Sequence, residues 1–382
     1  MELVLIIGME GITTMKLSAF YLTIIAFVLF GRFSMAQVPT SQILLPVEIN
    51  GKWGFIDSSG KIAIEPTFDY VESFSEGLAP FKQIINGKDK FGYINPKGEI
   101  IIPAKFEDAR EFSEGLAVVR INGKDGYINA TGEFIIEPIF EKAWTFSNER
   151  GRVLQLVKEK ADYLYGFVNT KGQIVIEPQY IFARDFQEDL AGIAVVIGEN
   201  IKMGFIDKEG KVVIKPKFSI VGNFTEGLAV VARNAKPYLF EGDLLFSDSE
   251  SKKRKISYID KSGKEIIKGN FQTASDFSEG LASVEIKNKW RFIDKTGKIV
   301  IDTDFPENAE LGDFSEGLAS LNFINGAKFI DKTGKIVIKT DFNWAESFSN
   351  GYARVKRIGK FGSESFGYVD KNGNLIWNPT TN

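Results

Sequence analysis

Residues 51–82 read GKWGFIDSSGKIAIEPTFDYVESFSEGLAPFK, and this stretch decides the fold. Asp57 and Gly60 stand at the first and last positions of a turn, where the Asp side chain bonds the backbone ahead and Gly tolerates a positive φ. Strand-like apolar residues lie on both sides of this turn, which predicts a β-hairpin with a glycine bulge. Pro66 follows the second strand, where a backbone N–H is no longer needed for pairing.

The same turn occurs nine times along the chain, which identifies an internal repeat. An Asp or Asn always stands three residues before the glycine. We interpret these side chains as turn-forming rather than as metal ligands or catalytic groups, because the turn explains them and Asn replaces Asp in three copies. The nine pairs are Asp57 with Gly60, Asn95 with Gly98, Asn129 with Gly132, Asn169 with Gly172, Asp207 with Gly210, Asp260 with Gly263, Asp294 with Gly297, Asp331 with Gly334, and Asp370 with Gly373.

An aromatic or apolar residue recurs at every third position after the second strand, as in Phe68, Val71 and Phe74. This spacing predicts a short 3₁₀ or α turn that is pinned into the core. The motif F-S-E-G-L-A then opens a further strand, as at Phe112–Ala117. Each unit is therefore predicted to be a three-stranded meander, which cannot bury its apolar face unless neighbouring units stack on it.

The predicted fold is all-β, a tandem array of nine three-stranded antiparallel meander repeats over residues 43–379. We expect an open superhelical, solenoid-like array. A closed ring resembling a β-propeller is the less favoured alternative. Propellers commonly use four strands per blade, whereas this unit shows three strands plus a turn. The array also begins and ends on whole units, which offers no strand exchange to lock a ring.

Residues 1–36 have the features of a secretory signal peptide. Lys16 precedes an apolar run over residues 17–30, and Ser34-Met35-Ala36 supplies small residues before a cut at Gln37. The alternative is a transmembrane anchor, although the apolar run is shorter than the ~20 residues that a span needs. We therefore expect an exported protein that is periplasmic, cell-surface or secreted and has no membrane span after cleavage. Met15 is a candidate for the true start, which would make residues 1–14 an extension from a mis-assigned start.

The composition narrows the possible chemistry. The chain has no Cys and no His, which excludes thiolate and His-based metal sites and the common nucleophilic triads. The formal net charge is −3, with no basic excess of the kind that binds nucleic acid. We expect no cofactor, no metal and no catalytic residue.

The combination of the D-x-x-G-K-x-V-I turn, the F-S-E-G-L-A segment and an aromatic-Gly pair resembles the WG-repeat family, also called the KWG repeat. The resemblance covers about 43–379, and the naming pair is intact at Trp53-Gly54. In copies six to eight the glycine becomes Ser257, Arg291 and Lys328. The resemblance implies a bacterial β-repeat protein, often exported, with no established activity and no catalytic residues to carry over.

The glutamate of the S-E-G motif is one candidate for a partner surface. One glutamate in most copies could line one face as a row of carboxylates and bind a cationic partner or Ca²⁺. A solvated turn residue is the alternative, because Ca²⁺ needs six to eight oxygens that converge on one point. The residues are Glu76, Glu114, Glu188, Glu226, Glu279 and Glu316.

A second candidate is an insertion at residues 234–255, where the spacing between turn glycines rises to 53 residues. Tyr238–Phe240 and Leu244–Phe246 predict an extra hairpin there, and Tyr238 and Phe240 are its candidate partner residues. A tolerated surface loop is the alternative, although insertions in repeat arrays often cluster on the binding face. The tryptophans offer stacking surfaces for sugars, or else core packing; they are Trp53, Trp144, Trp290, Trp344 and Trp377.

The function expected from these features is that of an exported, non-catalytic binding or scaffold module for a protein or polysaccharide. One alternative is a glycoside hydrolase that uses an unrepeated pair of carboxylates. Another is a purely structural component of the cell envelope. A single pocket with two close carboxylates that break the repeat would favour the hydrolase.

Overall fold

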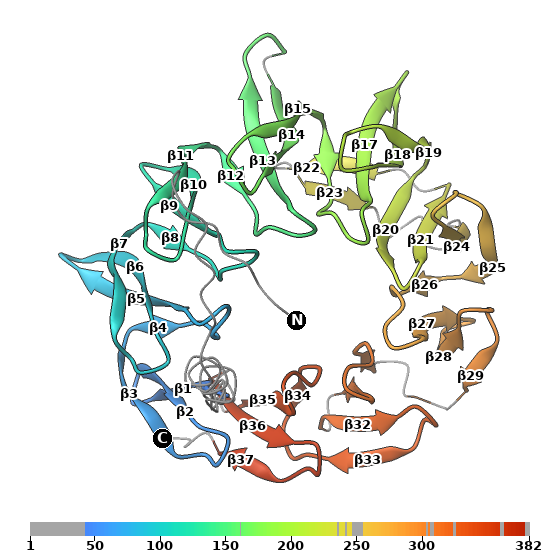
Figure 1. The fold of residues 1–382 in the computed structure, drawn as a ribbon. Coiled ribbons are helices and arrows are strands. Elements are labelled where there is room, and N and C mark those ends of the chain that lie inside the picture. The colour runs from blue at the N-terminus through green and yellow to red at the C-terminus, as the bar shows by residue number, and fades with distance from the viewer. Residues whose placement is uncertain are drawn as a thin grey trace, which may run out of the picture. The chain divides into compact units, whose positions relative to one another are not determined.

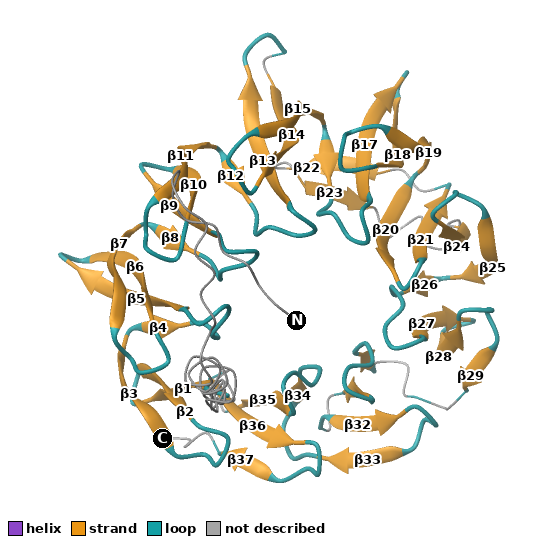
Figure 2. Cartoon of the chain, in the orientation of Figure 1, coloured by secondary structure: helices purple, strands orange, loops and turns teal. Residues whose placement is uncertain are grey.

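The structure is a computed structural model that describes residues 43–160, 162–234, 237–240, 243–246, 255–302, 305, 309–323, 326–359 and 363–378. The expected signal peptide at residues 1–36, with Met15, lies outside these residues. The chain from Ile43 onward forms one compact unit. All regular secondary structure in the described part is β-strand, which confirms the all-β prediction (Figure 2). No described helix is long and apolar enough to cross a membrane.

Nine small antiparallel sheets follow one another around a ring (Figure 1). Within the described ranges, the first sheet has three strands and the next eight have four. The strands of the first five sheets are β1 (Leu45–Ile49), β2 (Lys52–Ile56), β3 (Ile62–Phe68); β4 (Tyr70–Val71), β5 (Ala79–Ile85), β6 (Lys88–Ile94), β7 (Ile100–Phe106); β8 (Asp108–Ala109), β9 (Ala117–Ile121), β10 (Lys124–Ile128), β11 (Phe134–Phe140); β12 (Lys142–Ala143), β13 (Arg150–Val157), β14 (Asp162–Asn169), β15 (Ile174–Tyr180); β16 (Phe182–Ala183), β17 (Ala191–Ile197), β18 (Asn200–Ile206) and β19 (Val212–Phe218).

The remaining four sheets continue in the same order, and a separate two-stranded hairpin is inserted within the sixth. Their strands are β20 (Ile220–Thr225), β21 (Leu228–Arg233), β24 (Lys255–Asp260), β25 (Glu265–Phe271); β26 (Thr273–Ala274), β27 (Leu281–Ile286), β28 (Lys289–Asp294), β29 (Ile299–Ile301); β30 (Glu310–Leu311), β31 (Leu318–Asn322), β32 (Lys328–Asp331), β33 (Ile336–Lys339); β34 (Trp344–Ala345), β35 (Tyr352–Ile358), β36 (Glu364–Asp370) and β37 (Leu375–Trp377).

The closed ring shows that the expectation of an open, solenoid-like array was wrong and that the β-propeller alternative is right. The last sheet packs on the first, where Leu45, Val47 and Ile56 form one buried cluster with Tyr368. The Tyr368 hydroxyl donates a hydrogen bond to the Pro46 carbonyl at 3.0 Å. No described strand is exchanged between the two sheets, and among the described residues side-chain packing and this hydrogen bond join them.

The expected three-stranded unit was wrong as well, because the connector supplies a fourth strand. In the second sheet, Val71 pairs with Phe81 as part of the two-residue strand β4. The N–H groups of Asp69 and Glu72 donate to carbonyls of the next strand at 3.1 and 3.0 Å. Backbone pairing therefore replaces the predicted 3₁₀ or α turn. These short strands lie at the inner end of the second to ninth sheets, with strands such as β33 and β37 at the rim (Figure 1).

One aromatic contact repeats at the interfaces between sheets. Phe74, from the F-S-E-G motif of the second sheet, packs on Phe55 of the first with ring centroids 4.7 Å apart. A tilted or edge-on pair of this kind contributes about 0.5–1.5 kcal/mol beyond the area it buries. The equivalent pairs have centroids 4.7–5.0 Å apart and are Tyr93–Phe112, Tyr127–Phe146, Phe167–Phe186, Phe205–Phe224, Tyr258–Phe277, Phe292–Phe314 and Phe329–Phe348.

The glycine of the aromatic-Gly pair is required by a close approach of two backbones. A Cβ placed on Gly204 would lie 2.3 Å from the Ile214 carbonyl oxygen, where β19 bulges before Pro216. The sixth copy has Gly269 near the position of this proline, and Ser257 pairs there with Lys268. The loss of the Trp-Gly glycine in copies six to eight thus accompanies the loss of the proline, so it has a structural explanation.

The insertion within the sixth sheet begins after β21 ends at Arg233 and finishes where β24 begins at Lys255. Within it, β22 (Pro237–Phe240) pairs antiparallel with β23 (Asp243–Phe246). The side chains of Tyr238 and Phe240 lie outside the described part of the structure. The five tryptophans are all half-buried.

We expect Tyr368→Phe to lower the free energy of unfolding by about 0.5–1.5 kcal/mol, the usual worth of one hydrogen bond. The variant keeps the aromatic packing and removes only the hydroxyl that bonds Pro46 across the ring closure. Denaturant unfolding of the chain measures this loss. Tyr163→Phe is the matched control, because the Tyr163 ring is 49% exposed; equal effects of the two changes would contradict a role for the Tyr368 hydroxyl in closure.

Candidate functional site at the inner turns

The S-E-G motif forms a tight turn after each inner strand. In the first such turn Ser75 and Leu78 exchange two backbone hydrogen bonds of 2.9 and 3.0 Å. Glu76 and Gly77, between them, both have positive φ angles of 51° and 84°. Two successive residues in this conformation point their N–H groups into one concavity, which favours an anion or another acceptor.

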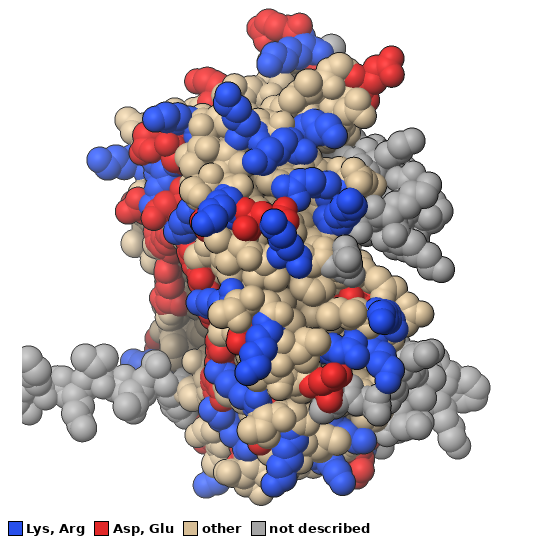
Figure 3. All heavy atoms as spheres, turned by 90° about the vertical axis from the view of Figure 1, so that its right-hand side faces the viewer, with Lys and Arg blue, Asp and Glu red and all other residues tan. Residues whose placement is uncertain are grey.

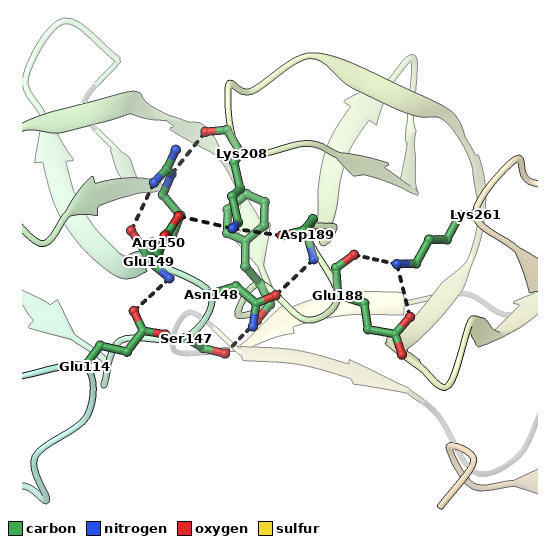
Figure 4. Close-up of polar contacts among 10 residues, drawn as sticks. Glu114, Ser147, Asn148, Glu149, Arg150, Glu188, Asp189, Lys208 and Lys261 are labelled. Carbon is green, nitrogen blue, oxygen red and sulfur yellow. Dashed lines mark hydrogen bonds and ion pairs between the residues drawn. The ribbon is translucent and has the colours of Figure 1, made fainter. Parts of the chain in front are cut away.

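In the turns that follow, a side chain of the preceding repeat fills the equivalent concavity. Glu76 accepts hydrogen bonds from the N–H groups of Glu114 and Gly115 at 2.8 and 2.9 Å. In the third copy the acceptor is an amide, since Asn148 Oδ1 accepts from the Asp189 N–H at 3.0 Å (Figure 4). The other contacts are Glu114 with Glu149 at 2.7 Å, Glu188 with Gly227 at 3.0 Å, Glu226 with Gly280 at 3.0 Å, Glu279 with Gly317 at 2.9 Å, and Glu316 with Gly351 at 3.0 Å.

The serine of the motif makes a second contact in the same direction around the ring. Ser75 Oγ donates to the Phe112 carbonyl at 2.6 Å, so the turn of one repeat holds the phenylalanine of the next. The same bond joins Ser113 to Phe146, Ser147 to Phe186, Ser278 to Phe314, and Ser315 to Phe348. The turns therefore form a continuous belt, which we call the turn belt.

Lysines from the D-x-x-G turns neutralise part of the turn belt. Lys261 lies 3.2 Å from Glu188, and Lys208 bridges Asp189 and Glu149 at 2.8 and 3.3 Å (Figure 4). Lys295, Lys332 and Lys371 pair in the same way with Glu226, Glu279 and Glu316. The first four D/N-x-x-G turns have no lysine directly after the Asp or Asn, the position that Lys208, Lys261 and Lys295 occupy in later turns. Glu76 and Glu114 are exposed and have no such partner among the described residues.

Every glutamate that was a candidate for the partner surface therefore accepts a hydrogen bond from the backbone of the next turn. Glu226, Glu279 and Glu316 are held between backbone N–H groups and a lysine, with 30–31% of each side chain exposed. Glu76 and Glu114 keep exposed carboxylates while they cap the next turn. In the described ranges, no group of three or more acidic residues is arranged to hold a metal ion.

The turn belt lowers the pKa of two of its carboxyls. Burial alone would raise the pKa of Glu226, but Lys295 and the Gly280 N–H outweigh burial and lower it. Glu279 is lowered in the same way by Lys332 and the Gly317 N–H. The belt is therefore built for ionised glutamates.

The D-x-x-G residues lie in turns of the expected type. Asp57 Oδ1 accepts from the N–H groups of Ser59 and Lys61 at 2.8 and 3.1 Å, and Gly60 has φ 83°. In the equivalent turns Asp207 accepts from Glu209 and Lys211, Asp294 from Thr296 and Lys298, and Gly210 and Gly297 have φ 80° and 85°. The side chains of Asp57, Asp207 and Asp294 are thus engaged locally.

Two carboxyl residues beside the inner strands, Glu72 and Asp276, stand at positions that vary between copies. The sequence did not single them out. Burial raises the pKa of Glu72, with the carboxylates of Glu111 and Asp108 acting in the same sense. Burial also raises the pKa of Asp276, which Arg184 opposes. The only sequence signal was that these positions vary between copies whose neighbouring positions do not.

The hairpins between the second and third strands of the sheets differ in length. The hairpin β9–β10 ends in a two-residue Asn-Gly turn after five-residue strands, whereas β17–β18 has seven-residue strands. Its tip exposes Val196 (59%) and Ile197 (52%). The neighbouring hairpin β13–β14 exposes Leu156 and Tyr163, which face each other across the strands. We call these four residues the hairpin tips.

Charge is spread unevenly over the surface seen in Figure 3. Lysine and arginine side chains are scattered across that face, whereas acidic side chains gather toward its left edge (Figure 3). The net charge is only −3, so the acidic edge reflects where the charged residues lie and not an excess of acidic residues in the chain.

The lowered pKa values predict acid sensitivity. A carboxyl whose folded pKa is depressed stabilises the protein above its unfolded pKa of about 4.3, and this stability is lost as the pH falls through the folded value. We expect the double variant Glu226→Gln with Glu279→Gln to lose about 1 kcal/mol of stability at pH 7 and to show a smaller further loss between about pH 5 and 3. Urea unfolding as a function of pH measures both effects.

The control for this double variant is Glu137→Gln, at an exposed position of β11. It should leave stability at pH 7 within about 0.5 kcal/mol of the unmodified chain. An unchanged pH profile in the double variant would contradict a stabilising role for ionised glutamates in the turn belt.

Comparisons with known proteins agree with this architecture. The chain is similar to a solved structure described as a eukaryotic initiation factor, with TM-score 0.59 and 11% identity over 88% of this chain and 95% of that one. AztD from Citrobacter koseri is less similar, with TM-score 0.39 and 11% identity over 78% and 93%. At 11% identity the likeness to the initiation factor shows the fold alone. No curated protein matches this chain in sequence.

The family comparison covers most of the ring. The model of the WG containing repeat matches eight segments, at residues 53–88, 91–124, 126–155, 165–195, 203–236, 256–290, 290–322 and 329–361. These segments carry the aromatic-Gly strands and the S-E-G turns described above. The chain therefore belongs to the WG containing repeat family.

Proposed function

We propose that this protein is an exported, non-catalytic binding module and that it recognises a protein partner through its hairpin tips. The exposed apolar side chains at Leu156, Tyr163, Val196 and Ile197 carry this proposal. Surface clusters of apolar residues with polar surroundings are characteristic of protein–protein contacts. The leader at residues 1–36 supports export.

The location of the elaborated hairpins supports the same surface. The connections β13–β14, β17–β18 and β21–β24 belong to three consecutive sheets, and each joins the second strand of its sheet to the third. Equivalent connections in a repeat protein emerge on one face, where insertions commonly mark the binding side. The third connection carries the β22–β23 hairpin, so three neighbouring repeats are extended at corresponding places.

The outer edge strands of the sheets also expose apolar side chains, and these can be compared with the hairpin tips. Val212 and Val213 on β19 are 45% and 42% exposed, and similar Ile and Val residues recur on the outer strands of the other sheets. These residues repeat regularly because each sheet has the same outer strand. Pro216 in β19 protects this edge from pairing with another strand. Exposed apolar tips occur in some of the described sheets and not in others, with Ile84 and Ile85 on β5 and Ile358 on β35 exposed as well. Sheet structure does not require them, so a partner is the better explanation for those on the neighbouring hairpins β13–β14 and β17–β18.

We expect the double variant Val196→Ser with Ile197→Ser to fold normally and to lose partner binding by about tenfold or more, since hot-spot residues each contribute about 1–2 kcal/mol or more. Capture from envelope extract with the immobilised mature chain, followed by titration of the recovered protein, measures this loss. Val212→Ser with Val213→Ser is the matched control and should bind like the unmodified chain.

Three results would count against a protein-binding role. Equal loss of partner binding in both double variants would show that the hairpin tips are not the binding surface. Binding only to immobilised polysaccharides would favour a carbohydrate ligand, and blank results in both experiments would favour a purely structural envelope component.

The hydrolase alternative has its own test at Glu72. A glycosidase acid needs a raised carboxyl pKa beside a second carboxylate. Glu72 is one described carboxyl of this kind, because burial raises its pKa and the carboxylates of Glu111 and Asp108 act in the same sense. We expect no release of reducing ends from cell-envelope polysaccharides by the unmodified chain. Hydrolysis that is present in this chain and at least about a hundredfold slower in Glu72→Gln would contradict the non-catalytic proposal.

A further inference from the structure

Side chains on the outer strands form a repeated row at the rim of the ring. They stand one, three and five positions after each turn glycine, and we call each set of three a rim stripe. In β11 the stripe is Glu133, Ile135 and Glu137, which are all exposed, whereas Ile136 between them is buried. The other stripes are Lys61, Ala63 and Glu65; Glu99, Ile101 and Pro103; Gln173, Val175 and Glu177; Lys211, Val213 and Lys215; Lys264, Ile266 and Lys268; Lys298, Val300 and Asp302; Lys335, Val337 and Lys339; and Asn374, Ile376 and Asn378.

The apolar residue at the centre of the rim stripe repeats, but the charges on either side of it do not. The stripes of the second to fourth sheets carry only acidic charges, with two glutamates in the third sheet. The stripes of the fifth, sixth and eighth sheets carry two lysines each and no acidic residue. The first and seventh stripes carry one charge of each sign, and the ninth carries none. The rim is therefore acidic in one part and basic in another.

The most acidic stripe and one of the basic stripes lie on opposite sides of the ring. β11 belongs to the third sheet and lies at the upper left of Figure 1, and β33 belongs to the eighth sheet and lies at the lower right. The other two basic stripes, on β19 and β25, are only two and three sheets from β11. A ring can hold one neighbour at β11 and another at β33 without a collision between the two neighbours.

The lysines of the β33 stripe have no acidic partner in the described ranges. Lys339 stands directly opposite Lys328 on β32, and like charges at such positions destabilise each other. Lys328, Lys335 and Lys339 form no ion pair with any described residue. The seventh sheet differs at the same two positions, because Arg291 lies 2.9 Å from Asp302 there. The eighth sheet thus has two lysines where its neighbour has an ion pair.

The β11 stripe matches the β33 stripe in spacing and is opposite to it in charge. Each has two charged residues four positions apart, with an apolar residue at the centre. Both strands have a register shift at the same place, so the spacing between the two charges is alike, roughly 13 Å in a strand. Ile135 is 40% exposed and Val337 is 45% exposed. The two stripes can therefore face each other with two ion pairs on either side of one apolar contact.

We propose that the β11 stripe of one copy of this protein binds the β33 stripe of a second copy, so that the rings associate side by side in a row. Two different surfaces meet in such a contact, and because they lie on opposite sides of the ring the contact propagates from copy to copy. The contact joins side chains and requires no pairing of strands, so Pro138 in β11 does not oppose it. This surface is distinct from the hairpin tips and does not rest on the proposed function.

The contact depends on charge, because its apolar area is small. We expect the purified protein to associate at an ionic strength of about 0.1 M and to dissociate at about 1 M, where the screening length falls to about 3 Å. Sedimentation velocity over a range of protein concentrations measures this association.

Two double charge reversals test the two stripes. One variant carries Glu133→Lys with Glu137→Lys, and the other carries Lys335→Glu with Lys339→Glu. Each should weaken its own association by about tenfold or more, because like charges then face each other. A mixture of the two variants should associate as the unmodified protein does, since each variant supplies the charges that the other has lost. Recovery in the mixture also shows that both variants are folded.

The stripe of β19 provides the matched control. Lys211→Glu with Lys215→Glu makes the same change of charge in the same kind of stripe, at a position where no contact is proposed. This variant should associate as the unmodified protein does.

Three outcomes would overturn the proposal. The first is an unmodified protein that stays monomeric at low ionic strength over the whole concentration range. The second is a mixture of the two reversal variants that remains monomeric. The third is an equal loss of association in the β19 control, which would show that β33 is not the specific contact. None of these outcomes changes partner capture through Val196 and Ile197, so failure here is distinguishable from failure of the proposed function.

Discussion

The contact between the phenylalanine of one repeat and the aromatic ring of the preceding sheet is the interaction on which the ring depends. A sheet of four short strands cannot bury an apolar face alone, and Phe74 on Phe55 is the first of eight such contacts. Burial places Phe74 beside the inner strand β4, so the connector is drawn into the sheet and its backbone pairs. The turn that follows then faces the next repeat.

The turn belt adds directional hydrogen bonds and ion pairs to this apolar packing. A carboxylate such as Glu226 reaches forward to the next turn and also meets Lys295, while a serine hydroxyl fixes the next phenylalanine carbonyl in most copies. Hydrophobic packing alone is not directional. The hydrogen bonds fix how far each sheet lies around the ring from the one before it, and they do so at residues that looked from the sequence like an exposed acidic row.

A repeat protein acquires its particular function where it departs from its own pattern. The loss of glycine at Ser257, Arg291 and Lys328 attracts attention in the sequence, but it follows the loss of the edge-strand proline. The departures at the hairpin tips and in the β22–β23 insertion have no such internal explanation. The first sheet is a third departure, because it has three strands within the described residues where the other eight sheets have four.

The sequence by itself determined the local structure. Asp57 with Gly60 specifies a turn, Ile62–Ile64 a strand and residues 234–255 an insertion, because each depends on neighbours a few positions away. Only the tertiary structure decided between an open array and a ring, since closure rests on Tyr368 and Pro46, which are 322 positions apart. The role of the glutamates was decided in the same way, because Glu76 bonds the backbone 38 and 39 positions ahead, a distance at which no local rule acts.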